Sequence, residues 1–468
     1  MRRGSFTGTG AGAGRVRAPE DTVYSFWQTL AYGTQHILSM YGGVIAPPII
    51  VGTAAGLKAG DIALLLTAGL FVSGVSTMLQ TLGIWKFGSR LPVVQGISFI
   101  SVSSMTVIVS DDGMPTLFGA IIVAGLIGLL IAPLFGTVLR FFPPVVTGSI
   151  IVVIGISLMP VALTWIQGGQ GAENFGSLSN LGLAGATFLV IMLLSRLFQG
   201  VVSRLSILLG IAAGTVIAGL VGKADFGSIG DGPLVSFPSI LPFGAPEFRI
   251  SAIVTMTIVA LIIMIETATA GIITVGEIIG AEVDSERVAS GLRADMLSTA
   301  AAPVFGAFPV GAFAQNVGLV ALTGIKSRYV VAAGGAVMML LGFLPVVGRV
   351  VAAIPYPVLG GAGIVLFGTV AASGIRSLAT VKFEGNLNLV LVAATLSVGI
   401  IPQLAPDFWH AAPSWLGVVL HSGITSAAVL AVVLNLFFNQ WKWRSESSGS
   451  ADQAESDTRV EPADHAAM

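Results

Sequence analysis

The chain has 468 residues, of which 54% are hydrophobic and only 10% are charged, and its formal net charge is -1. A soluble globular domain carries about 25% charged residues, so this composition, with a mean hydropathy of +0.92, excludes a water-soluble protein of this size. The near-zero net charge gives no indication of nucleic-acid binding. The absence of cysteine excludes a disulfide framework and a thiolate metal site.

The two ends of the chain differ in composition from everything between them. Residues 1–22 are rich in Gly and Arg and lack an apolar core, so we predict a disordered N-terminus and no signal peptide. Residues 444–468 are rich in Ser, Ala and acidic side chains, which predicts a disordered tail. Between them, apolar blocks such as residues 64–82, 117–139 and 145–163 approach or reach the roughly 20 residues that span a bilayer.

About fourteen apolar segments follow one another, which predicts an all-α integral membrane protein. They begin near Phe26, Asp61, Val93, Met114, Val145, Leu181, Val202, Ile250, Ala294, Val310, Tyr329, Val351, Leu387 and Ser414. An even number of segments puts both termini on one side of the membrane. If that side is the cytoplasm, the outside positions hold only four of the 22 Lys and Arg, namely Lys58, Lys223, Arg249 and Arg349, as the positive-inside rule requires.

The sequence repeats itself weakly at an interval of seven segments. Residues 144–155 align with residues 357–368, in the fifth and twelfth segments. The third and tenth segments both open with a proline and a glycine-containing break, at residues 91–99 and 308–318. An odd offset gives the two halves opposite orientations, and matching breaks in an inverted repeat indicate the substrate site of a transporter.

Few ionisable residues fall inside apolar segments, and such residues usually face a pathway in the protein interior. Glu266 lies in the eighth segment, where an ionised carboxylate accepts hydrogen bonds and suits the N–H groups of a heterocycle. A structural carboxylate bonded to backbone is the alternative. We expect Asp295, in the ninth segment, to lie near the cytoplasmic end of that segment. It is either part of the transport pathway or a structural residue that caps a helix or pairs with Arg293. His36, in the first segment, fits an inter-helix hydrogen bond better than a proton carrier.

The tenth segment carries further polar and aromatic candidates. Gln315 and Asn316 follow its break, and a carboxamide offers both a donor and an acceptor to a polar substrate. The same groups could instead satisfy backbone atoms freed by the break. Phe99 and Phe313, at the two breaks, could stack on a base or simply pack.

Catalytic motifs are missing from the sequence. It has no Gly-x-Ser-x-Gly, no His-Glu-x-x-His and no phosphate-binding Gly-x-x-x-x-Gly-Lys, so we predict neither an enzyme nor a cofactor or metal site. Transport must then be driven by an ion gradient or run downhill.

Residues 315–324 resemble the signature motif of the nucleobase–ascorbate transporter family, also called nucleobase:cation symporter-2. In that motif a Gln or Glu precedes Asn, a Gly and a Thr, here Gln315, Asn316, Gly318 and Thr323. The Gln-His pair ending at His36, the eighth-segment glutamate and an aspartate twenty residues before the motif also match. The resemblance covers roughly residues 23–443.

The resemblance implies a fold of fourteen helices in two inverted seven-helix repeats, with short strands in broken segments 3 and 10. A core domain would comprise residues 23–140 and 250–347, and a gate domain residues 141–249 and 348–443. Substrate would lie between the two half-helices. The implied substrate-binding residues are Glu266, Gln315, Asn316, Phe99, Phe313 and Gly318, and the implied coupling or structural polar residues are His36, Asp295 and Thr323.

Relatives that transport xanthine or uric acid tend to begin the motif with Gln and end it with Thr-Gly, as here. We therefore predict a multi-pass, homodimeric, proton- or sodium-coupled purine permease of the cell membrane, surrounded by lipid and working by an elevator-like mechanism. The eighth segment reads Glu266-Thr-Ala-Thr-Ala and lacks the acidic residue of many relatives, which leaves the coupling ion and the substrate open. The alternatives are a permease for uracil or another nucleobase, an anion carrier of the same fold and, from other classes, a membrane receptor or an integral-membrane enzyme.

Overall fold

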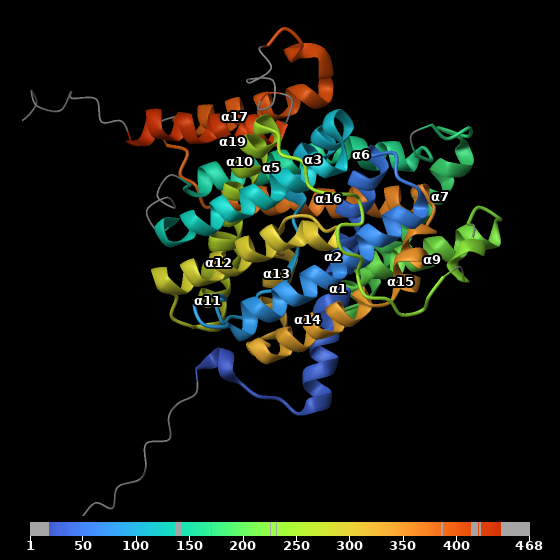
Figure 1. Ribbon diagram of the computed structural model, residues 1–468, viewed down its shortest axis with the longest axis horizontal. Helices are drawn as coiled ribbons and strands as arrows, with labels where there is room; N and C mark the ends of the chain where they lie inside the picture. Colours follow the sequence, from blue (N-terminus) through green and yellow to red (C-terminus); the bar gives the residue numbers. More distant parts are fainter. Residues whose placement is uncertain are drawn as a thin grey trace, which may run out of the picture.

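The computed structural model describes residues 18–440, apart from 136–141, 170, 225, 231, 385–386, 413–419 and 421–422. The predicted tail, residues 1–17 and the predicted start of the fourteenth segment at Ser414 lie outside the described residues. The described chain is mostly helical (Figure 1).

The first half of the chain contains one short strand and a series of helices. They are η1 (Pro19–Asp21), α1 (Phe26–Ala54), α2 (Ala59–Leu82), β1 (Gln95–Ile97), η2 (Phe99–Ser101), α3 (Val102–Ile131), η3 (Ala132–Leu134), α5 (Pro144–Ser157), α6 (Met159–Ile166), α7 (Leu178–Leu197), α8 (Val201–Arg204), α9 (Ser206–Leu220) and η5 (Gly227–Gly230).

The second half contains the other short strand of the described chain. Its elements are α10 (Ile250–Glu266), the π-helix η6 (Thr267–Ile273), α11 (Thr274–Ile279), α12 (Ser285–Ala301), η7 (Ala302–Phe305), β2 (Val310–Ala312), α13 (Ala314–Thr323), α14 (Arg328–Gly342), α15 (Pro345–Ala352), α16 (Tyr356–Leu378), α17 (Leu387–Leu404), η8 (Pro406–Trp409), α19 (Gly423–Asn435) and the π-helix η9 (Leu436–Gln440).

Eight helices of the described chain are long and apolar enough to cross a membrane, and the pair α14–α15, bent by 80°, makes a possible ninth. Several of the fourteen predicted segments correspond to shorter helices such as α9, α13 and α19. Two others form one helical run of 36 residues, Phe99–Leu134. A straight helix of that length would measure about 54 Å, against about 30 Å for the bilayer core. Gly113, with φ 81° and ψ 174°, breaks the run immediately before Met114, where the fourth segment was predicted to begin.

Three predicted boundaries differ from the structure. The ninth segment begins at Ser285 instead of near Ala294, because the Asp284 side chain caps α12 by accepting the Arg287 N–H at 2.7 Å. The twelfth segment begins at Tyr356, and Val351, its predicted start, belongs to α15. Residues 19–21 of the N-terminus that we predicted to be disordered form η1.

Two ion pairs hold η1 against the rest of the chain. Glu20 pairs with Arg287 at 2.5 Å, and Asp21 pairs with Arg328 at 2.7 Å. The Glu20 side chain is only 8% exposed. The arginines lie in the first turns of α12 and α14, so a short segment that precedes α1 is joined to two helices of the second half.

The strands lie in the two broken segments, as predicted, and form an antiparallel pair. Gln95 pairs with Ala312 and Ile97 with Val310, with Gly96 opposite Gly311 at the centre. Backbone hydrogen bonds continue this register at both ends, from the Ser98 N–H to the Pro309 carbonyl and from the Phe313 N–H to the Val94 carbonyl. The two broken segments therefore cross in the middle of the chain's fold.

A threonine holds each strand at the same position. The Thr77 hydroxyl on α2 accepts the Gln95 N–H at 2.9 Å and donates to the Gln95 carbonyl at 3.2 Å. The Thr299 hydroxyl on α12 does the same for Val310, at 3.1 Å and 3.4 Å. Because α2 and α12 carry the second and ninth segments, the hydrogen bonds follow the seven-segment repeat read from the sequence.

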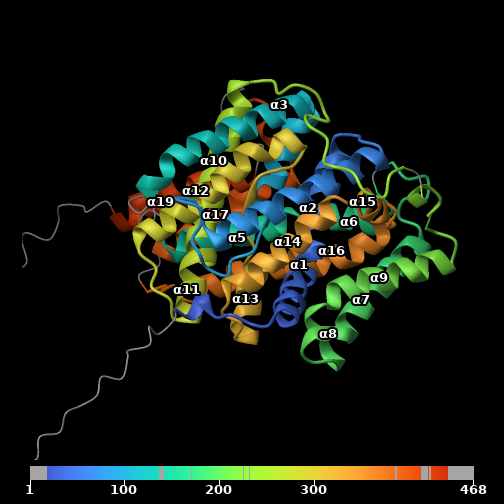
Figure 2. The ribbon, with the colours of Figure 1, turned by 60° about the horizontal axis from the view of Figure 1, so that its bottom comes forward.

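The helices pack mainly within two sets. In one set α2 and α1 pack on α14, while α10 and α12 pack on α3. In the other, α16 packs on α5, α6 and α7, and α17 on α19 and α5. Figures 1 and 2 both show α7 and α9 together at one edge of the molecule, and Figure 1 shows α17 beside α19 at another. Both sets contain equivalent helices from the two halves, as an inverted repeat demands.

Candidate functional site

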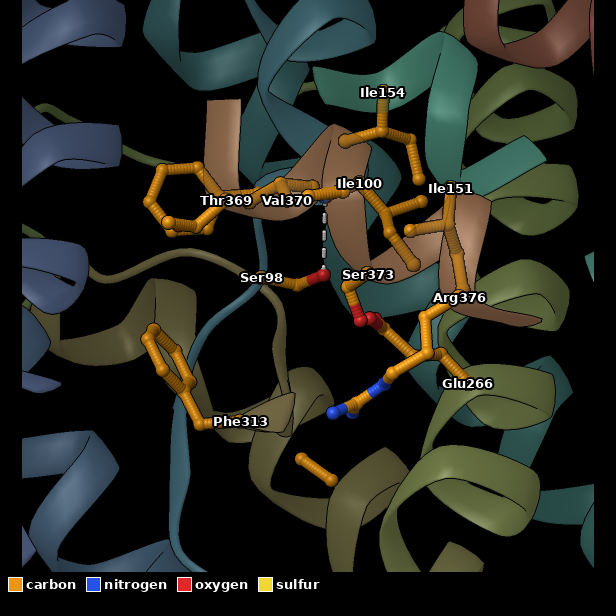
Figure 3. A pocket seen from close by; sticks show the side chains of 13 residues that line it. Ser98, Ile100, Ile151, Ile154, Glu266, Phe313, Thr369, Val370, Ser373 and Arg376 are labelled. Atoms are coloured by element: carbon orange, nitrogen blue, oxygen red, sulfur yellow. Dashed lines mark hydrogen bonds between the residues drawn. The ribbon is translucent and has the colours of Figure 1, made fainter. Parts of the chain in front are cut away.

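A cavity of about 360 Å³ lies where the two broken segments meet the second helix set. Its size is within the range of small-molecule sites in proteins. It is lined by residues of both breaks, of α10, and of the facing helices α5 and α16: Ser98, Phe99, Ile100, Ala312, Phe313, Glu266, Ile151, Ile154, Thr369, Val370, Ala372, Ser373 and Arg376. Figure 3 shows it from close by. A mostly apolar wall with a few polar groups is typical of a small-molecule binding site.

Glu266 is the carboxylate of this cavity. It is the last residue of α10, immediately before the π-helix η6 widens the backbone, and π-helical turns occur frequently at functional sites. Its side chain makes no hydrogen bond with any residue of the described chain. Gly271, within η6, packs so closely on β2 that a Cβ there would lie 2.6 Å from the Ala312 methyl. The glutamate is therefore held against the strand pair, with its carboxylate available to a ligand.

Two helix N-termini border the same cavity. The first is that of the η2–α3 run, where the Ser98 hydroxyl accepts the Ile100 N–H at 3.3 Å (dashed in Figure 3). The second is that of α13, which begins directly after Phe313. Backbone N–H groups and the helix dipole favour electron-rich atoms at such ends, so these sides of the cavity suit carbonyl oxygens or negative charge.

Aromatic rings form another side of the cavity. The Phe99 and Phe313 rings lie 6.2 Å apart, and Phe99 meets Phe367 edge-on at 6.0 Å. The row continues from Phe367 through Trp165 to Tyr356, at centroid distances of 6.5 Å and 6.3 Å. Aromatic faces favour offset stacking with another flat ring. Phe99 and Phe313, predicted as stacking residues, thus line the site, and the row behind them gives them support.

Arg376 is a cavity residue that sequence reasoning missed. It was counted only as a cationic residue of an inside position, but it lines the cavity from α16. A usable signal was present: Thr369, Ser373 and Arg376 recur at i, i+4 and i+7 in an apolar segment, which places three polar side chains on one helix face.

Asn316, predicted as a substrate-binding residue, is not among the residues that line the cavity. Its carboxamide is buried, with the oxygen 2.5 Å from His36 Nδ1 and the nitrogen donating to the Pro92 carbonyl at 3.2 Å. It therefore satisfies a backbone group freed by the break, the alternative that the sequence left open. The same contact is an inter-helix hydrogen bond for His36, as expected for that residue.

Asp295 is also placed differently from the prediction. It lies in the middle of α12 and is fully buried, beside the Thr267 hydroxyl. Asp284 caps the helix, and Arg293 pairs with Glu286 at 2.9 Å, so the alternative roles of Asp295 as a cap or as a partner of Arg293 do not apply. The difference follows from the helix beginning nine residues earlier than expected, at Ser285 rather than Ala294.

The remaining motif residues lie on α13. Thr323 closes that helix: its hydroxyl donates to the Leu319 carbonyl at 2.8 Å and accepts the Ile325 N–H at 3.3 Å, ahead of Gly324 in the left-handed region. The side chain of Gln315 and the surroundings of Gly318 lie outside the described part of the chain. Among the described residues, no group of three His, Cys, Asp or Glu side chains is arranged to hold a metal ion.

Comparisons with known proteins agree with this architecture. The model of a permease family matches residues 27–408. The chain is 40% identical to a xanthine permease of Bacillus subtilis over 93% of this chain and 99% of the relative. It is 38% identical to the uric acid transporter UacT of Escherichia coli, over 93% of this chain and 91% of the relative.

Among solved structures, the transmembrane domain of the cyanobacterial bicarbonate transporter BicA matches 89% of this chain and 99% of its own length. The TM-score is 0.57 at 15% identity, which shows a shared fold.

A helical membrane chain with two crossed broken segments around a cavity is a multi-pass transport protein. The chain belongs to the permease family, and the resemblance to nucleobase:cation symporter-2 proteins seen in its sequence is confirmed.

Proposed function

We propose that this permease carries a purine base, xanthine or uric acid, across the cytoplasmic membrane, with both termini in the cytoplasm. The observation that carries the proposal is the Glu266 carboxylate, which enters a cavity whose other lining residues are, apart from Arg376, apolar, aromatic or hydroxyl-bearing. An oxidised purine is flat, so it fits beside the Phe99 and Phe313 rings. Its ring N–H groups provide the donors that a carboxylate needs. The names of relatives that align over nearly the whole chain support the same substrate class.

Movement of one helix set against the other would open the cavity to each side in turn. We propose that the set containing the strand pair and Glu266 is the core domain, residues 23–140 and 250–347, which carries the substrate. Residues 141–249 and 348–443 form the gate domain and the contacts of a homodimer in the lipid bilayer. The few contacts between α1 and α9 and between α10 and α19 are consistent with such sliding. The driving ion is the proton.

The test is uptake of radiolabelled xanthine and uric acid into cells that express the protein. Glu266→Gln should abolish high-affinity uptake of both bases, because the amide replaces one acceptor oxygen by a donor. Glu277→Gln on the following helix, where the glutamate is exposed, is the matched control and should transport normally. Normal uptake by Glu266→Gln at equal expression would refute the role of the carboxylate.

An anion carrier is the second candidate, because the fold is shared with a bicarbonate transporter and two helix N-termini face the cavity. A carboxylate in the cavity opposes binding of a small inorganic anion. Competition separates the two: excess bicarbonate or sulfate should leave xanthine uptake unchanged if the substrate is a purine.

A further inference from the structure

The cavity contains a cation as well as a carboxylate. Arg376 reaches it from the last turn of α16, and Figure 3 shows the Arg376 and Glu266 side chains pointing into the same space. The two groups do not neutralise each other, since no Arg376 nitrogen lies within 4.0 Å of a Glu266 oxygen. Within the described chain, Arg376 takes part in none of the four ion pairs.

The two groups also come from different helix sets. Glu266 belongs to the set that holds the strand pair, whereas α16 packs on α5, α6 and α7. An ionised carboxylate only accepts hydrogen bonds, and a guanidinium only donates them, through five N–H groups in a planar fork. A ligand that satisfies both must therefore offer N–H groups on one edge and carbonyl oxygens or negative charge on another.

Oxidised purines meet this requirement in proportion to their number of carbonyl groups. Uric acid has three, xanthine two and hypoxanthine one, and uric acid is largely an anion at neutral pH. Charge-assisted hydrogen bonds from arginine to such oxygens are stronger than neutral ones, and the fork fits two acceptors at once. The helix N-termini beside Ser98 and Phe313 add further hydrogen-bond donors for carbonyl oxygens or negative charge on the ligand.

We propose that Arg376 is a specificity-determining residue that binds the carbonyl-rich or anionic edge of the substrate, opposite the edge held by Glu266. This inference rests on the proposed purine transport and deepens it. Arginine here selects oxidised purines over bases with fewer acceptors, and it joins the substrate to the gate side of the cavity while Glu266 joins it to the core side.

An alternative is that Arg376 only anchors the cytoplasmic end of a membrane helix. Arg196 provides the matched control, because it is an exposed arginine in the last turn of α7, another helix of the same set, and does not line the cavity. Arg376→Lys tests the positive charge apart from the planar arrangement of donors. Lysine keeps the charge, and with it the positive-inside preference, but it lacks the planar guanidinium donors.

The experiment measures competition of uric acid, xanthine and hypoxanthine against labelled xanthine for the wild type, Arg376→Lys, Arg376→Gln and Arg196→Gln. Ligand-induced thermal stabilisation of the purified proteins provides a second readout of binding. Arg376→Gln should weaken uric acid about ten- to a hundredfold, as expected for loss of a hydrogen bond between charged groups. Hypoxanthine should change by less than about threefold, Arg376→Lys should lie between, and Arg196→Gln should match the wild type.

The outcomes distinguish this inference from the function on which it rests. If the wild type neither takes up nor is stabilised by any purine, the proposed function fails and this inference fails with it. If the wild type binds purines and Arg376→Gln keeps their order of preference, or weakens all three equally, the specificity role alone is overturned. A parallel loss in Arg196→Gln would also overturn it, because it would show a general effect of removing a cytoplasmic cation.

Discussion

The hydrogen bond between Asn316 and His36 favours a structural role for Asn316 over a direct contact with the substrate. Both functional atoms of the carboxamide are used inside the protein, one by His36 and one by the Pro92 carbonyl that precedes β1. Replacing Asn316 by leucine leaves these buried partners unmatched. The expected cost is about 1–3 kcal/mol of unfolding free energy.

Thermal unfolding of the purified protein measures this loss. Asn388→Leu is the control, because that asparagine is only partly buried on α17 and its hydrogen bonds to the Lys382 carbonyl and Asn439 lie at the surface, so its loss should change stability by less than about 0.5 kcal/mol. A variant Asn316→Leu with wild-type stability and lost substrate binding would contradict the structural role and favour direct contact.

Other residues show how far sequence reasoning reached. Glu266, Phe99 and Phe313 line the cavity, and each stood out in the sequence because a charge in an apolar segment or an aromatic ring at a break is visible locally. Arg376 was missed because its position near a segment end matched the positive-inside rule, and only the fold brings it to Glu266. The hydrogen bonds of Asn316 to His36 and to the Pro92 carbonyl could not be predicted for a related reason: periodicity assigns a residue to a break but does not show which other residues are buried beside it.

At the level of single elements, the strand pair depends on helices that flank it. Each strand is only three residues long, and the Thr77 and Thr299 hydroxyls satisfy both backbone groups of one residue in each. Thr77→Val and Thr299→Val keep the shape of the side chain and remove the hydroxyl. Each should destabilise the protein by about 1–3 kcal/mol, because a buried N–H and carbonyl lose their partner.

The control for these variants is Thr255→Val on α10, whose buried hydroxyl bonds only to the Ser251 carbonyl of its own helix. That substitution should be nearly neutral, since the carbonyl keeps its helical hydrogen bond. Equal effects of all three valines on the midpoint of thermal unfolding would show that the strand contacts carry no special stability.

Sequence patterns predicted the positions of some of these elements correctly and the boundaries of others wrongly. The breaks were predicted correctly from Pro and Gly, and the strands lie in them. The start of α12 was placed too late because its first turns are charged, so an apolar pattern begins only near Ala294. The aspartate cap at Asp284 was the better signal. By contrast, the fourth segment was predicted to begin at Met114, directly after the Gly113 break that divides one long helical run.

On the scale of the whole molecule, transport requires a driving force that the chain itself does not supply. The sequence contains no phosphate-binding motif for ATP, so the proposed purine uptake should depend on a proton gradient. Accumulation of labelled xanthine should rise at acidic external pH and collapse on addition of a protonophore. Uptake that survives the protonophore and instead follows external sodium would contradict proton coupling.

The fold class and the inverted repeat were predictable at this scale. Hydrophobic composition shows about fourteen apolar stretches, and the spacing of Pro and Gly shows two matching breaks. The joining of η1 to α12 and α14 was not, because ion pairs such as that between Glu20 and Arg287 link residues far apart in the chain. Within the described residues, helices long and apolar enough to span a membrane account for part of the predicted segments, and shorter helices such as α13 account for others.

The antiparallel pairing of β1 with β2 bears on how such a chain can arise. With Gly96 opposite Gly311 at its centre, the pair has the two-fold arrangement that two identical strands make in a symmetric dimer. A half-length ancestor with seven segments could form this pair with a second copy of itself only if the copies were inserted into the membrane in opposite directions. Fusion of the two copies after gene duplication fixes each direction permanently, and each half is then free to gather its lysines and arginines on the cytoplasmic side.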